Sequence, residues 1–380
     1  MSTTLAKDFW VNLKYWVRKH RRAVALSVAA GVGGYCAYRY YRSLAQEQIA
    51  KEGKRKDAEE HAELQLQHHF ESIQKIADAT TLPSVLPHLK DQLFTLVDLS
   101  VLTEKLMAGK GQAAALGHKE KIGIWEELKV LSFTRTVSAV FSVALLDVFL
   151  RTQLNILGRR VYLETARDSS EDVLPELHSR LTKACQHRFV GLVDYLPYTG
   201  LKDLVNDVQT ATEQVVGRRE LRDKVQLAEL GDIFQQTRQQ LESQELQWGK
   251  YVLPADNSVS LPAMSGDAEE RWGAEDEENL AALMDETRGI LNSSEFANVL
   301  SAALDCLLTD MQSDLRLAFQ DSPEDGIPLA KLLPHVAGVG NALLESADDN
   351  KYVRSIAELS EVQGFCAAVY AGGRGAEHEQ

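Results

Sequence analysis

The sequence has few of the residue patterns that mark a chemical site. It contains four cysteines in 380 residues, at positions 36, 185, 306 and 366, with no CxxC pair and no zinc-site spacing. It has no GxxxxGK[ST], HExxH or GxSxG motif. The run Gly338-Val-Gly340 begins like a dinucleotide-binding loop, but it lacks the third glycine and a preceding strand. We therefore expect reduced thiols, no metal or other cofactor, and no enzymatic activity.

Strand-like alternation and internal repeats are also absent from the sequence, and there are only nine prolines. Long stretches rich in Ala, Leu, Glu and Gln indicate helices instead. We predict an all-α fold, in which a transmembrane helix precedes a large helical bundle with long helices. The expected helices are residues 43–78, 84–107, 121–167, 173–196, 201–216, 223–248, 277–291, 294–319, 329–345 and 352–370. We expect the first helix to end at the sequence Thr80-Thr-Leu-Pro83. Ser84 would then cap the second helix.

The charge of the chain is divided unevenly. Residues 1–56 contain 12 Lys and Arg against three Asp and Glu, whereas the whole chain carries a net charge of −14. A basic arm joined to an acidic body is typical of a soluble domain attached to a membrane surface or to nucleic acid. The acidic body would repel phosphates, so we expect no nucleic-acid partner.

One uncharged stretch lies within the basic arm, from Ala23 to Tyr38, with arginines on both sides. Sixteen helical residues span about 24 Å against a hydrocarbon core of about 30 Å, and snorkelling arginines can cover the difference. A cleaved signal peptide would need a small-residue cleavage site, which is not clear here, and the stretch is too continuously apolar for a transit peptide. Dense charge on both flanks argues against a buried core helix. We expect a basic segment at 1–22, a transmembrane anchor at 23–41, a helical domain at 42–371 with an acidic loop at 252–276, and a flexible tail at 372–380.

The longest predicted helix has a nearly continuous apolar middle, from Val137 to Leu150. As a second transmembrane span it would place Arg135 and Asp147 in hydrocarbon, at about 3 kcal/mol each. A helix that is apolar on all sides is also what the centre of a bundle requires, so we interpret it as the core helix.

The start of this helix carries an unusual combination of side chains. Trp125, Leu128 and Lys129 are spaced i, i+3 and i+4, and therefore share one face. Two interpretations remain open. The face can be bundle core, or it can form one wall of a groove that receives an amphipathic helix, with Trp125 as the anchor and Lys121 and Lys129 as rim charges.

Several stretches, in order along the chain, resemble the peroxin-3 family. The most specific is residues 124–135, IWEELKVLSFTR. The others are 69–72 (HFES), 150–158 (LRTQLNILG), 161–163 (VYL), 286–288 (ETR), Phe296, 299–300 (VL) and 327–334 (IPLAKLLP).

The resemblance implies a single-pass peroxisomal membrane protein with most of its chain in the cytosol, inserted directly or by way of the endoplasmic reticulum. It implies docking of peroxin-19, a chaperone and import receptor for peroxisomal membrane proteins, through an amphipathic helix held in an apolar groove. Membrane lipids would be contacted through the N-terminal anchor. The implied groove residues are Trp125, Leu128, Lys121 and Lys129, with Thr103 and Leu106 on the facing wall and Asn155 as a further candidate. The alternative function is a lipid-binding helical membrane protein, which a large apolar cavity inside the bundle would favour.

Overall fold

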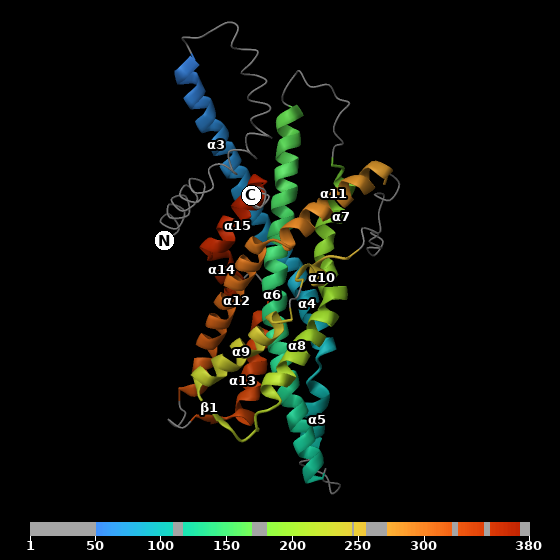
Figure 1. Ribbon diagram of the computed structural model, residues 1–380, viewed down its shortest axis with the longest axis vertical. Coiled ribbons are helices and arrows are strands. Elements are labelled where there is room, and N and C mark those ends of the chain that lie inside the picture. The colour runs from blue at the N-terminus through green and yellow to red at the C-terminus, as the bar shows by residue number, and fades with distance from the viewer. Residues whose placement is uncertain are drawn as a thin grey trace.

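A computed structural model describes residues 51–108, 117–168, 181–244, 247–255, 272–320, 326–345 and 350–372. The predicted anchor, the C-terminal tail after Gly372 and most of the acidic loop lie outside these residues. The described part is an elongated bundle of long helices, as Figure 1 shows. The prediction of an all-α bundle is confirmed.

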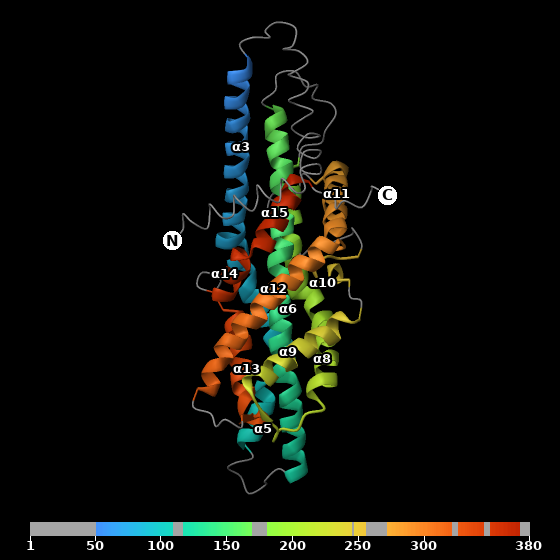
Figure 2. The same cartoon turned by 60° about the vertical axis from the view of Figure 1, so that its left-hand side comes forward.

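Helix α6, His118–Asp168, is the centre of the bundle. Its 51 residues span about 75 Å at about 1.5 Å per residue. Helices from every other part of the described chain pack along it, as Figures 1 and 2 show. The packing helices are α3 (Lys51–Ile76), α4 (Leu82–Leu96), α5 (Ser100–Ala108), α7 (Lys183–Gly191), α8 (Leu201–Val216), α9 (Leu227–Glu242), α10 (Gly249–Val252), α11 (Ala274–Leu291), α12 (Ser294–Leu315), α13 (Leu329–Leu343), α14 (Lys351–Glu358) and α15 (Ser360–Ala371).

The apolar middle of α6 is enclosed by these neighbours. Among the described residues, α6 is the one helix long and apolar enough to cross a membrane, and the whole of its apolar window is buried inside the protein. Asp147, within this stretch, is fully buried and paired with Arg151. The interpretation of this segment as a core helix is therefore confirmed.

The predicted break at Thr80–Pro83 is wrong. A π-helical segment, Ala77–Thr81, carries α3 directly into α4. Pro83 lies in the first turn of α4, where its missing N–H costs little. Ser84 does not cap the helix, because its hydroxyl donates to the carbonyl oxygen of Thr81 at 2.7 Å.

The chain breaks later, between α4 and α5, so the predicted helix at 84–107 is divided in two. Val97 leaves the helical conformation with φ −122° and ψ 71°. The carboxylate of Asp98 then accepts a hydrogen bond from the backbone N–H of Ser100 at 2.8 Å, which stabilises the start of α5. This break allows α5 to pack separately against α6.

A two-residue strand pair was not predicted. Strand β1, Lys224–Val225, pairs antiparallel with β2, Ile327–Pro328. Consequently α9 begins at Leu227 rather than at the predicted residue 223, and Gln226 and Glu229 form a capping box at its start. Two residues are too short to show alternation, so no sequence pattern marks these strands.

The N-cap of α12 offers a test of local stability. The sequence allows either Ser293 or Ser294, and the structure identifies Ser293, whose Oγ accepts from the backbone N–H of Phe296 at 3.1 Å. We expect Ser293→Ala to lower the free energy of unfolding by about 1 kcal/mol, because one N–H loses its partner. Ser294→Ala is the matched control, since the described contact of that hydroxyl is to the exposed Glu295. Urea unfolding followed by circular dichroism would show equal losses if the assignment is wrong.

Candidate docking surface

Helix α5 and the first turns of α6 form one end of the molecule. In both Figure 1 and Figure 2 this end lies opposite the start of α3 and the C-terminal end of α6. The N-terminal arm of the sequence leads into α3. The α5–α6 end is therefore the end of the bundle far from the start of the described chain.

Large apolar side chains are exposed at this end. Their exposed fractions are 49% for Val101, 67% for Met107, 45% for Ile122 and 36% for Trp125. We call these four residues, with the half-buried Leu106 and Ile124, the apical surface. Several exposed apolar side chains at one end of a soluble domain indicate an interaction site, whereas single ones need no explanation.

The apical surface continues the buried stripe of α6. Trp125 lies one helical turn before Lys129, and Ile122 lies a further turn before Trp125. Toward the core the same stripe continues with Lys129 and Phe133, which are both fully buried. The α6 face is thus buried from Leu128 toward the core and partly exposed at Trp125 and Ile122, nearer the start of the helix.

Two predicted groove residues are inside the protein. Leu128 belongs to the hydrophobic core, with 9% of its surface exposed. Lys129 has no exposed surface, and its ammonium donates to the backbone carbonyl of Arg219 and pairs with Glu126, each at 2.5 Å. The expectation that Lys129 is a rim charge is wrong. A buried ammonium needs hydrogen-bonding partners, and Lys129 finds one in the loop that follows α8. This hydrogen bond links α6 to that loop.

Three other predicted residues do lie at this end. Thr103 and Leu106 are half-buried on α5, which packs against α6, and Lys121 is half-buried in the first turn of α6. The hydroxyl of Thr103 donates to the carbonyl oxygen of Leu99 at 2.8 Å. Its methyl group is therefore the part of this side chain suited to an apolar contact.

Asn155 is not part of the apical surface. It lies 30 residues beyond Trp125 on α6, or about 45 Å along the helix. Its side chain is fully buried, where it donates to the carbonyl oxygen of Arg151 at 2.7 Å and accepts from Gln74 at 3.0 Å. Asn155 therefore has a structural role between α3 and α6.

Sequence reasoning missed Val101, Met107 and Ile122. Ile122 could have been found, because it precedes Trp125 by three residues and shares its helix face. Val101 and Met107 could not, since their exposure depends on the break at Val97 and on the way α5 packs against α6.

The described residues contain no group of three or more His, Cys, Asp or Glu side chains that could hold a metal ion. The fold and this end surface define the class of protein: an elongated α-helical bundle whose central helix exposes apolar side chains near its start. A family model described as Peroxin-3 matches residues 112–372. The chain belongs to the Peroxin-3 family, as the resemblance of residues 124–135 and the other stretches predicted.

Relatives from plants, mammals and yeast share this similarity. The chain is 31% identical to Peroxisome biogenesis protein 3-1 of Arabidopsis thaliana over 372 residues, which cover 93% of this chain and 97% of the relative. It is 26% identical to Peroxisomal biogenesis factor 3 of Mus musculus over 392 residues, covering 96% and 97%. A shorter match, 29% over 128 residues, joins 30% of this chain to 28% of Peroxisomal membrane protein PEX3 of Komagataella phaffii.

The family assigns the broad role of the chain. Peroxin-3 proteins are peroxisome biogenesis factors and not a family of enzymes. The names of the relatives support a place at the peroxisomal membrane. The chain is therefore a peroxisome biogenesis factor, as the sequence-based assignment stated.

Proposed function

We propose that the apical surface docks an amphipathic helix of peroxin-19, and that the chain thereby acts in the insertion of peroxisomal membrane proteins. The observation that carries the proposal is the uncovered stripe of α6, where Ile122 and Trp125 continue a buried face into solvent. A helix with apolar side chains at i, i+3, i+4 and i+7 is the kind of partner that covers such a stripe.

The charges around the apical surface suit an amphipathic partner. Lys105 on α5 and Lys119 on α6 are exposed beside it, and so are Glu104 and Glu127. Charges at the rim of an interface contribute chiefly to the rate of association and to partner choice, whereas the buried apolar anchors supply most of the affinity. We expect Trp125 to be the central anchor.

We further propose that residues 23–41 anchor the chain in the peroxisomal membrane as a single span, with the bundle in the cytosol. The arrangement of the helices supports this topology, because the apical surface and the start of α3 are at opposite ends of the long axis. Docking at the far end would leave the partner room to carry a membrane-protein cargo above the bilayer.

Two glutamate substitutions test the docking site. Met107→Glu and Ile122→Glu each place a charge where the partner helix would lie, and both positions are already exposed, so folding should be unaffected. We expect each change to raise the Kd for peroxin-19 by about ten-fold or more, measured by calorimetry with the full chain in detergent.

The matched control is Leu317→Glu. Leu317 is 66% exposed in the turn that follows α12, on neither α5 nor α6. Its substitution should leave the Kd unchanged. An equal loss in all three variants, or no loss in the first two, would refute the apical surface as the docking site.

A further inference from the structure

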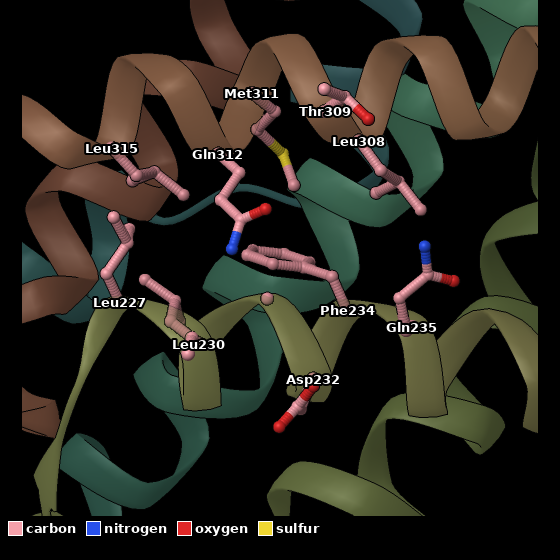
Figure 3. A pocket seen from close by; sticks show the side chains of 12 residues that line it. Leu227, Leu230, Asp232, Phe234, Gln235, Leu308, Thr309, Met311, Gln312 and Leu315 are labelled. Carbon is pink, nitrogen blue, oxygen red and sulfur yellow. The ribbon is translucent and has the colours of Figure 1, made fainter.

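A concave site lies on the side of the bundle, between α9 and α12. Figure 3 shows its lining, which joins an apolar floor to polar side chains at the edge. Its volume is about 210 Å³, and it shares no residue with the apical surface. The floor consists of Leu230, Phe234, Leu308, Met311 and Leu315, all of them buried. Pockets for whole cofactors or drug-sized ligands usually measure about 300–1,000 Å³, so this one suits a single large side chain.

A glycine in α9 is part of the pocket lining. Gly231 stands inside the helix, where glycine is less favourable than alanine. A Cβ atom at this position would lie 2.6 Å from Nε2 of Gln312, too close for ordinary contact. The missing side chain therefore leaves room for the Gln312 amide, which Figure 3 shows directed from α12 toward the ring of Phe234.

Two side-chain amides face this pocket from opposite helices. Gln235 on α9 and Gln312 on α12 are both half-buried, and neither side chain makes a hydrogen bond to another described residue. Each amide offers donors and an acceptor. A peptide backbone, with one N–H and one C=O per residue, is a complementary partner for such a pair.

The two helices that form the pocket carry more acidic than basic residues. Helices α9 and α12 together carry seven Asp and Glu against one basic residue, Arg238. The guanidinium of Arg238 is already paired with Glu242 at 2.8 Å and with Asp305 at 2.5 Å. Asp314 on α12 is paired with Lys351, and Glu229 accepts a hydrogen bond from the backbone N–H of Gln226. Acidic residues still outnumber basic ones on these two helices, and Asp232 is the acidic residue of the lining. This negative charge disfavours nucleic acid and anionic lipid, and it favours a cationic ligand.

We propose that this pocket binds a peptide segment of a partner protein in which one large apolar side chain is flanked by Lys or Arg. The apolar side chain would enter the pocket, the amides of Gln235 and Gln312 would bond its backbone, and the basic neighbours would lie against the acidic helices. This surface differs in charge and position from the apical surface, so both can be occupied at the same time.

The test uses a defined probe with the full chain in detergent. The probe is the peptide acetyl-Lys-Lys-photoleucine-Lys-Lys-amide, and a second peptide has Glu in place of every Lys. After irradiation, mass spectrometry should place the cross-links of the first peptide on α9 and α12. We expect the Glu peptide to react about ten-fold less, because its charges are repelled.

Variants connect the reaction to the pocket. Gly231→Leu should remove the cross-links by filling the site, whereas Gly289→Leu on α11 should not, because a side chain there meets open space. If Gly231→Leu fails to fold by circular dichroism, the double change Gln235→Ala with Gln312→Ala decides. It should lower cross-linking by about five-fold or more through lost hydrogen bonds.

Equal reaction of the two peptides, or cross-links outside α9 and α12, would overturn the proposal. Equal reaction of the glutamine double variant and the unchanged protein would do the same. Trp125→Ala should leave the cross-linking unchanged, so this test is independent of the outcome at the apical surface.

Discussion

Replacing Trp125 with alanine is expected to weaken the binding of peroxin-19 by more than about 2 kcal/mol, or about thirty-fold in Kd. The indole lies at the point where the buried stripe of α6 becomes exposed, with 36% of its surface open to solvent. A docked helix would cover this exposed part of the indole. Large aromatic anchors of this kind contribute most of the binding energy of interfaces. Calorimetry with the full chain in detergent measures the change.

The same substitution should leave the protein folded. A partly exposed side chain at the end of a helix contributes less to stability than a core residue, whose truncation costs about 3–5 kcal/mol. Phe133, two turns further along the stripe and fully buried, provides the contrast, because Phe133→Ala should lower the stability of the bundle strongly. If circular dichroism shows that Trp125→Ala unfolds the chain, the indole is a core residue and the docking proposal fails.

The sequence predicted the central helix well because the pattern that indicates it is a long, continuous apolar stretch. The apolar stretch from Val137 to Leu150 required burial on every side, and only a bundle or a membrane can provide that. Asp147 favoured the bundle, and the structure supplies its counter-charge four residues away in Arg151. The exact helix ends around Thr81 and Val97 were missed, since a π-helical segment and a break depend on packing against α6.

The candidate site was predicted only in part, for a related reason. Spacing alone correctly places Trp125, Leu128 and Lys129 on one helix face. It does not tell where the neighbouring elements stop covering that face. The loop after α8 reaches Lys129 through the carbonyl of Arg219, 90 residues away in sequence, and so divides the face into a buried and an exposed part. Asn155 was misplaced because a polar residue inside a long helix can serve an internal hydrogen-bond network, here with Gln74 and the carbonyl of Arg151.

Arg151→Met is expected to lower the free energy of unfolding by about 3–5 kcal/mol, because it breaks a buried ion pair. The guanidinium donates twice to the carboxylate of Asp147, at 2.8 and 3.1 Å, and reaches Asp78 in the π-helical segment at 2.5 Å. Asp147 has no exposed surface. Without Arg151 the charge of Asp147 would be buried with no counter-charge. The ion pair that links Asp78, at the junction of α3 and α4, to α6 would also be lost.

The loss should depend on pH in a definite direction. Burial raises the pKa of Asp147 even with Arg151 beside it, and removing the guanidinium takes away the attraction that opposes this rise. A carboxyl group whose folded-state pKa lies above the unfolded value of about 3.9 binds a proton more readily in the folded protein. The destabilisation of Arg151→Met should therefore be greatest at neutral pH and should diminish as the pH falls through the folded-state pKa. Urea unfolding at pH values of about 7 and about 5 would show this trend.

A double substitution separates charge from packing. Asp147→Leu combined with Arg151→Met replaces both buried charges with apolar groups, a change that is often neutral or stabilising in other proteins. Asp78 is 44% exposed and can be solvated once Arg151 is absent. The double variant should therefore recover most of the stability lost in Arg151→Met, and it should no longer show the pH trend. If the double variant is as unstable as the single one, Arg151 stabilises the bundle through its packing and its contacts to α3 rather than by neutralising Asp147.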